Sequence, residues 1–398
     1  MFREKKIRVL FFEPYPMGLG GNFVTQRYIL DKLDKTLFSP MVLAPVPGIA
    51  LDEFKKIGIE CFIIPPNGQL SSYGGIVLKA GIFDRIRAGF DILKYNWKLS
   101  RFLRSQKIDV VYANCVRAEM SIGLAARLAG VPTLLYIKGE LDNPVIDRLS
   151  FFLASKVLFF SEGNKNDKYK GLVNFFKKKI GILPIGLDPK GIAEVESRDK
   201  SALKRELGID SEYTNVIVLA QLYPPKGQHF VLQALERLVG DFPNVRLYLL
   251  GDHVIEEYKS YKVELERFVL EGGLEKNVLF TGWRKDALDV VSLMDIMIHP
   301  SLAEGFGRAV LESMALGKPV IASRIGGLRE AIKDGENGFL VSPGNVNEIE
   351  QRWRQLLVDT ELRDRLGKAA KATVYSEYLI DDKVVSLANI WKQMVEKK

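Results

Sequence analysis

The sequence predicts an α/β protein with two doubly wound domains, each a parallel sheet flanked by helices. The chain has 398 residues, 47% of them hydrophobic, and single cores rarely grow past roughly 250 residues. Short apolar runs alternate with helical patterns along its whole length, as in doubly wound folds. Both halves also open alike: a strand-like run (7–12 and 216–220), a turn rich in Pro and Gly, and a helical pattern (23–33 and 228–238).

The remaining elements follow the same alternation. Helices are expected at 82–103 and 119–129 in the first half, and one beginning near Arg308 in the second. Ligands of such sheets bind at the carboxyl ends of the strands. Further strands are expected at 41–46, 61–65, 109–114, 133–137, 156–161 and 179–184 in the first half, and at 246–251, 277–282, 295–300, 319–323 and 338–342 in the second.

The domain boundary is expected where a Gly/Pro stretch gives way to the charged segment 196–207. This places an N-terminal domain at 1–190 and a C-terminal domain at 191–375. The last helical stretch, 376–398, is expected to cross back onto the first domain.

Charge divides unevenly between the halves. Residues 1–190 hold 29 Lys/Arg and 17 Asp/Glu, a balance of +12, whereas the remainder hold 28 and 32, a balance of −4. A basic half suits anionic lipid headgroups or lipid-linked phosphates. No recognised nucleic-acid module or interleaved aromatic and basic patch is found, so nucleic acid is not expected as a partner.

Cellular location is predicted from cysteines and apolar runs. Only Cys61 and Cys115 occur, which indicates buried thiols in a reducing compartment. No apolar run approaches the roughly 18 residues that span a bilayer. A cytoplasmic protein is expected, with peripheral contact at the inner face of the membrane as a further option.

The segment 82–104 is a basic amphipathic helix. Ile82, Ile86, Phe90, Leu93 and Trp97 recur at helical spacing among several Lys and Arg residues. A helix of this kind ordinarily packs its apolar stripe on its own domain. The alternative is docking to an anionic membrane surface, which the charge of the first domain favours.

The segment 299–323, HPSLAEGFGRAVLESMALGKPVIAS, has the layout strand, loop, helix. Glu304 would lie in the loop, Gly305 and Gly307 let the backbone approach a ligand, and the helix N-terminus beyond them suits a phosphate. Glu312, one turn into the helix, can accept both hydroxyls of a ribose. Alternatively, both carboxylates merely favour the helix N-terminus electrostatically.

Glu304 and Glu312, inside AEGFGRAVLE and followed by GKPVIAS and GGLREAI, resemble the retaining glycosyltransferases of the GT-B fold, family 4 (glycosyl transferases group 1). The resemblance covers nearly the whole chain, including GLGG after the first strand, ILPIGLDP, KGQHFVLQAL and NVLFTGW. It implies a GT-B fold, with two Rossmann-like domains facing each other across a cleft: the N-terminal domain on the acceptor side, and the C-terminal domain binding the nucleotide sugar.

The resemblance also implies roles for individual residues. Glu304 would contact the hydroxyls of the donor sugar, Glu312 the ribose and Lys226 the diphosphate, with the nucleobase bound near 282–284. The catalytic residues would be Glu304, Lys226 and Lys138. The donor-binding residues would be Gly20, Gly21, Gln221, Lys226, Glu304, Gly305, Phe306, Gly307 and Glu312.

Two positions depart from the family pattern. Gln221 stands where relatives carry Arg, so one cation is missing, and either Lys226 suffices or another cation, Arg308 or Arg324, compensates. Lys138 stands where relatives often carry His, with Glu140 close enough in sequence to pair with it. Asn114 likewise replaces a His of some relatives, and His299 is interpreted as a partly buried hydrogen-bonding residue.

The expected function is transfer of a sugar, with retention, from a UDP or GDP sugar to a lipid-linked or glycan acceptor in cell-envelope polysaccharide synthesis. No metal or other cofactor is expected, because no Asp-x-Asp motif is placed to hold a metal ion. A nicotinamide enzyme is disfavoured, because Phe23 stands where a dinucleotide fingerprint needs its third glycine. The departures at Gln221 and Lys138 leave a second hypothesis, a sugar-nucleotide-binding protein without catalytic activity.

Overall fold

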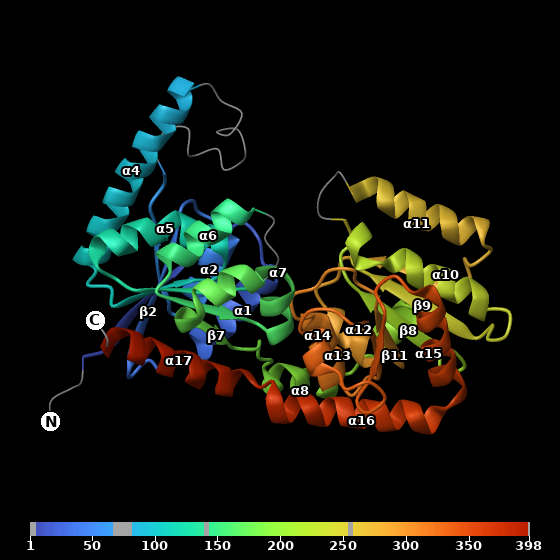
Figure 1. Ribbon diagram of the computed structural model, residues 1–398. Coiled ribbons are helices and arrows are strands. Elements are labelled where there is room, and N and C mark those ends of the chain that lie inside the picture. Colours follow the sequence, from blue (N-terminus) through green and yellow to red (C-terminus); the bar gives the residue numbers. More distant parts are fainter. Residues whose placement is uncertain (1–4, 67–81, 139–142, 254–257, 397–398) are drawn as a thin grey trace. The chain divides into compact units, whose positions relative to one another are not determined.

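The computed structural model describes residues 5–66, 82–138, 143–253 and 258–396 (Figure 1). The chain forms two compact units. The first contains Met1–Phe160, Lys165–Gly186 and Ile380–Lys398, and the second contains Ser161–Asn164 and Leu187–Leu379. The division therefore falls four residues before the expected boundary, and residues 161–164 lie with the second unit rather than the first.

The first unit is built on a seven-stranded sheet in the order β3-β2-β1-β4-β5-β6-β7. Every neighbouring pair is parallel, as expected when strands are joined by crossover helices. The strands are β1 (Ile7–Phe12), β2 (Phe38–Ala44), β3 (Glu60–Ile63), β4 (Val110–Ala113), β5 (Thr133–Ile137), β6 (Lys156–Phe159) and β7 (Ile180–Ile182).

Helices cover both faces of this sheet. α4 (Ile82–Ser105) and α5 (Val116–Ala129) pack on one face, where Leu10 and Val111 point, and α6 (Pro144–Leu153) packs beside α5 on that face. On the other face, Trp391 of α17 (Ile380–Glu396) contacts the rings of Phe11 and Tyr112. The other described helices are α1 (Gly21–Lys32), α2 (Ile49–Lys56) and α7 (Glu162–Phe175).

α4 packs on its own unit, but not through the stripe that the sequence suggested. Tyr95, Leu99 and Leu103 are at most 4% exposed and join the core. Phe90 is 70% exposed, and Leu93 and Trp97 are each 58% exposed. The side chains of Ile82 and Ile86 lie outside the described residues. The expectation that this apolar stripe packs on the domain is thus wrong for its described part, because the helix carries a second apolar stripe.

The second unit is built on a six-stranded sheet in the order β10-β9-β8-β11-β12-β13, again parallel throughout. The strands are β8 (Thr214–Leu219), β9 (Val245–Leu250), β10 (Val278–Gly282), β11 (Ile296–His299), β12 (Val320–Ser323) and β13 (Phe339–Val341). The helices are α8 (Pro189–Ser197), α9 (Ser201–Glu206), α10 (Gln228–Leu238), α11 (Lys259–Glu271), α12 (Ala287–Ser292), α13 (Arg308–Ala315), α14 (Leu328–Ala331), α15 (Val346–Val358) and α16 (Thr360–Glu377).

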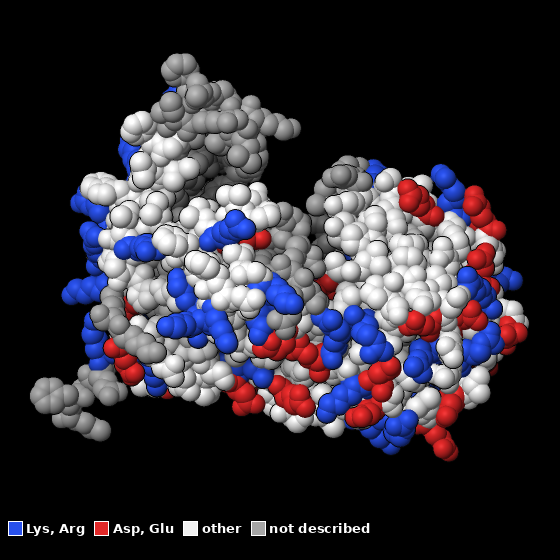
Figure 2. Space-filling model, viewed as in Figure 1, with Lys and Arg blue, Asp and Glu red and all other residues white. Residues whose placement is uncertain are grey.

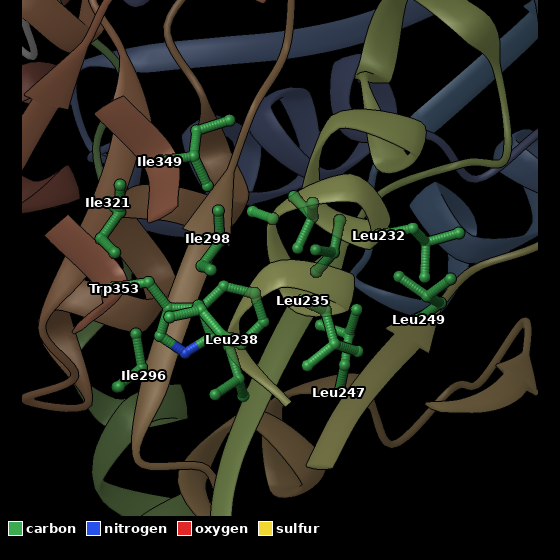
Figure 3. Packing of buried hydrophobic residues seen from close by; sticks show 14 of the residues in the cluster. Leu232, Leu235, Leu238, Leu247, Leu249, Ile296, Ile298, Ile321, Ile349 and Trp353 are labelled. Carbon is green, nitrogen blue, oxygen red and sulfur yellow. The ribbon is translucent and has the colours of Figure 1, made fainter. Parts of the chain in front are cut away.

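One large cluster forms the core between this sheet and the helices α10, α11 and α15 (Figure 3). Leu235 of α10 and Trp353 of α15 pack onto Leu247 and Ile298 of the strands, and all four side chains are fully buried. All thirteen strands of the described residues overlap the apolar runs in the sequence, so the prediction of two doubly wound α/β domains is confirmed. The expected cleft between the domains stays a prediction.

Both cysteines are free and half-buried, rather than fully buried as expected. No helix in the described ranges is long and apolar enough to cross a bilayer.

Candidate active site

Loops at the carboxyl edge of the second sheet carry the predicted donor-site residues of this unit. β8 leads into a loop with Gln221 and the short 3₁₀ helix Pro224–Lys226, and β11 leads into a loop that ends at α13. β8 and β11 are neighbours and parallel, so both loops leave the same edge.

Glu304, Lys226 and His299 form one charged cluster. The Nζ atom of Lys226 lies 2.7 Å from Oε2 of Glu304, and the Nε2 atom of His299 lies 3.1 Å from the same oxygen. The Ser301 hydroxyl lies 3.1 Å from Nε2 of His299. His299 is 2% exposed, which agrees with its interpretation as a buried hydrogen-bonding residue, but its partner is the predicted sugar-binding carboxylate.

These neighbours keep Glu304 ionised. Burial alone would raise the pKa of its carboxyl group, but the hydrogen bond with His299 and the charge of Lys226 outweigh burial and lower this pKa to about 2. An ionised carboxylate only accepts hydrogen bonds. Near neutral pH, Glu304 can therefore receive hydroxyl groups of a ligand but cannot donate a proton.

The turn before α13 leaves a helix N-terminus at the site. Gly307, the N-cap residue, has φ +78°, and no described side chain caps the helix. Uncapped N-terminal amides and the helix dipole favour an anion. The Phe306 side chain is buried against Tyr378, with ring centroids 5.5 Å apart, so Phe306 can contribute to a ligand site only through its backbone.

Close packing of the two loops places Lys226 beside Glu304. Gly227 follows Lys226 with φ +74°, and a Cβ atom on it would lie 2.3 Å from the carbonyl oxygen of Pro300. The amide of Leu302 donates to the carbonyl of Pro225 at 2.7 Å. Only glycine permits this approach, so the packing of the two loops requires the glycine of the KGQ motif.

Glu312 and Gln221 complete the predicted donor residues of this unit. The Nε atom of Arg308 lies 2.8 Å from Oε1 of Glu312, and both side chains are mostly buried. Gln221 has an exposed side chain, and its carbonyl accepts a 2.7 Å hydrogen bond from the buried Gln228. The loop after β8 is thus anchored through its backbone.

Comparison with known proteins identifies relatives of this chain. Residues 199–373 match the family model described as glycosyl transferases group 1. Over this stretch the chain is similar to the group 1 glycosyltransferases. It is 23% identical over 380 residues to an Escherichia coli UDP-Gal:alpha-D-GlcNAc-diphosphoundecaprenol alpha-1,3-galactosyltransferase, covering 90% of this chain and 96% of the relative.

A second relative matches over a shorter stretch. The N-acetyl-alpha-D-glucosaminyl L-malate synthase of Bacillus anthracis is 31% identical over 189 residues, and the match spans about half of each protein (48%). Solved structures match the fold over nearly the whole glycosyltransferase. The Anabaena protein HepE in complex with UDP and glucose has a TM-score of 0.77 at 22% identity, covering 97% of this chain and 99% of that one. A glycosyltransferase from Rickettsia africae has a TM-score of 0.81 at 20% identity, covering 99% and 100%. This likeness identifies the GT-B fold.

The other predicted residues of the glycosyltransferase belong to the first unit. Gly20 and Gly21 are exposed at the N-terminus of α1, which has no side-chain cap. Lys138 follows β5, and its Nζ atom lies 5.2 Å from the ring centre of Tyr136. Its predicted partner Glu140 lies outside the described residues. That these residues join the donor site stays a prediction.

Of the two proposed compensating cations, the structure favours Arg308. Arg308 opens α13 beside Glu312, whereas Arg324 pairs with Asp334 at 2.9 Å. In the predicted nucleobase region, Arg284 is held by Glu206 at 2.7 Å and by Asp286 at 2.8 Å. The described residues contain no group of three or more His, Cys, Asp or Glu side chains that could hold a metal ion.

Sequence reasoning missed Glu13, which follows β1 and is 2% exposed. Its carboxylate accepts hydrogen bonds from the amide of Tyr15 at 2.8 Å, from the Gln26 side chain and from the side-chain amide of Asn114 at 3.3 Å. Burial raises its pKa, although these hydrogen bonds and the charge of Lys138 oppose the change. An acidic residue directly after a buried strand was the available signal.

Proposed function

We propose that the glycosyltransferase moves a sugar from a nucleotide diphosphate sugar, with UDP or GDP as the nucleotide, to a lipid-linked or glycan acceptor. The contact of Lys226 and His299 with Glu304, beside the N-terminus of α13, carries the proposal. In this arrangement the ionised Glu304 can accept hydroxyl groups, while Lys226 and the helix N-terminus supply positive potential for a diphosphate.

Each part of the donor has a partner in this unit. The amides before and at the start of α13 would bind the diphosphate together with Lys226. Glu312 would accept the ribose hydroxyls, and Glu304 the hydroxyls of the sugar. Lys Nζ has three donors, so Lys226 can keep its contact with Glu304 while reaching a phosphate oxygen.

The reaction follows from this assignment. Breaking the anomeric bond leaves positive charge on the sugar and negative charge on the departing diphosphate. Lys226 and the helix amides stabilise the diphosphate as its charge develops, which is the usual source of such catalysis. The departing phosphate takes the proton of an acceptor that attacks from the same face, so the anomeric configuration is retained. Glu304 orients the sugar, and no metal or other cofactor is required.

The missing cation at Gln221 is the weak point of the donor site. Loss of one stabilising donor typically costs on the order of 3 kcal/mol in the transition state. Arg308 is the first residue of the helix at which the diphosphate would bind. A ribose bound to Glu312 would displace Arg308 from this carboxylate, so the guanidinium of Arg308 could then contact the phosphates. Arg308 is therefore our proposed substitute for the Arg that relatives carry.

The proposed acceptor and cellular location of this glycosyltransferase rest on relatives that are named for cell-envelope synthesis. The Escherichia coli relative is named for a diphosphoundecaprenol-linked substrate, and a Staphylococcus aureus relative, 22% identical over 366 residues, is named for capsular polysaccharide biosynthesis. We infer that this glycosyltransferase works on the cytoplasmic side of the membrane in the assembly of an envelope polysaccharide.

The test is the melting temperature of the wild type and of Glu312→Ala with a panel of nucleoside diphosphates and their sugar conjugates. A ligand that binds only the folded state raises stability, so one nucleotide should raise the wild-type melting temperature, and Glu312→Ala should lose the response. Glu275→Ala, an exposed carboxylate next to the amino end of β10, is the matched control. A response retained by Glu312→Ala would contradict the donor site.

A further inference from the structure

The outward face of α4 carries apolar and basic side chains that have no role in the donor site. Phe90, Leu93 and Trp97 are exposed, as are Lys94, Lys98 and Arg101. These six residues, the α4 face, lie opposite the buried stripe of the same helix, since 3.6 residues make one turn. Exposed aromatic and aliphatic residues in a contiguous group signal an interaction site.

The charge on this face has one sign. From Ile92 to the end of α4 the sequence contains four basic residues and no acidic one. The guanidinium of Arg101 lies 4.8 Å from the ring centre of Trp97, so aromatic and cationic groups are interleaved rather than segregated. Figure 2 shows Lys and Arg along the edge of the first unit where α4 runs in Figure 1.

Another helix on the same face of the sheet repeats this chemistry. Val145, Leu149 and Phe152 of α6 are between 43% and 74% exposed, and Arg148 is exposed between them. Arg127 of α5 lies over the Phe152 ring, 4.5 Å from its centre. Two helices on one face of the first sheet therefore present apolar side chains with basic neighbours.

We propose that the α4 face docks onto the surface of an anionic phospholipid bilayer, with α4 parallel to the membrane. Phe90, Leu93 and Trp97 enter the boundary between headgroups and acyl chains, while Lys94, Lys98 and Arg101 contact the phosphates. The aliphatic stems of the basic residues let their charges reach the headgroups. The docking uses no residue of the donor site, so it can fail or hold independently of the proposed function.

The charges are tested by flotation of the full chain with phosphatidylcholine vesicles, with and without phosphatidylglycerol. The wild type should float only with the anionic vesicles and should be released by salt. Lys94→Gln/Lys98→Gln/Arg101→Gln should bind at least about tenfold more weakly. The control Lys204→Gln/Lys276→Gln/Lys333→Gln has the same net charge and changes exposed residues of the second unit, so it should bind like the wild type. Equal losses in both variants, or equal binding to neutral vesicles, would overturn the proposal.

The contact itself is tested with brominated lipids, which quench tryptophan fluorescence at short range. Trp97 and Trp283 are exposed, at 58% and 74%, whereas Trp353 and Trp391 are fully buried. Vesicle quenching should disappear in Trp97→Phe, which retains an aromatic ring and should still float, and it should persist in Trp283→Phe. Quenching that depends on Trp283 would place the membrane on the other unit. The α4 face would be a protein interface instead if the wild type stayed off the vesicles but self-associated, and if Phe90→Ser/Leu93→Ser abolished this self-association. This result, like quenching that depends on Trp283, would refute lipid docking by α4.

Discussion

At the scale of single residues, the ionisation of Glu304 makes the stability of the protein depend on pH. The pKa of its carboxyl group is lowered from 4.5 to about 2 in the folded protein, so the folded state holds the ionised form more strongly than the unfolded state does. This contribution to stability is fully present above about pH 5 and is lost as the pH falls toward 2.

Glu304→Gln should therefore flatten the acid side of the stability profile. A shift of this size corresponds to at most about 3 kcal/mol, so the free energy of unfolding of the wild type should fall more steeply than that of the variant between pH 5 and pH 2.5. Urea denaturation across this range measures the difference. Glu275→Gln is the exposed control and should follow the wild type; parallel curves for wild type and Glu304→Gln would show that the carboxylate is not held ionised by its neighbours.

The sequence predicted Glu304, Lys226 and Glu312 as site residues, but not the contacts that determine their ionisation and position. His299 was interpreted as structural because a lone histidine after an apolar strand usually is, and its distance to Glu304 depends on how the loop 300–307 folds back. The ion pair of Arg308 with Glu312 was not predicted, although their spacing of four residues places both on one helix face. Glu13 escaped notice because its partners Gln26 and Asn114 come from other elements.

At the scale of elements, two loops are clamped together by a glycine. Gly227→Ala places a side chain at φ +74° and brings its Cβ atom within 2.3 Å of the Pro300 carbonyl oxygen. A left-handed backbone costs a non-glycine residue about 1–2 kcal/mol, and the overlap should add about 1–3 kcal/mol. Lys226 should also move away from Glu304, so the nucleotide response should fall.

Gly335→Ala separates these two effects. Gly335 has φ +80°, but a Cβ atom there would meet nothing within 4 Å, so only the backbone cost applies. Denaturant titration should show the larger loss of stability for Gly227→Ala. Equal losses would mean that the two loops are not in tight contact.

Sequence patterns predicted the positions of the helices and strands more accurately than they predicted which face of each helix is buried. Every strand was found, because a parallel strand buried on both sides reads as a short apolar run. The sequence correctly predicted an apolar stripe on α4, but the described part of this stripe faces solvent rather than the core. The helix also carries Tyr95, Leu99 and Leu103, and only the packing of the unit decides which of two apolar stripes enters the core.

At the scale of the whole molecule, each unit contains one fully buried tryptophan that reports on its stability. Trp391 of α17 packs on Phe11, Phe38 and Tyr112 in the first unit, and Trp353 lies in the core of the second. Replacing either with Ala should cost that unit about 3–5 kcal/mol.

Calorimetry should show the two changes in different transitions. Trp391→Ala should lower the unfolding temperature of the first unit, and Trp353→Ala that of the second. A single transition that both variants shift equally would indicate that the units unfold together.

α17 also has a consequence for synthesis on the ribosome. The chain leaves the first unit after Gly186 and returns to it only at Ile380, so the last helix of that unit is translated after the entire second unit. The sheet that begins at Ile7 is made first, yet one of its faces waits for Trp391 until nearly all of the chain has emerged. The second unit has all its strands and helices earlier, so the later-encoded domain can finish folding while the earlier one is still incomplete.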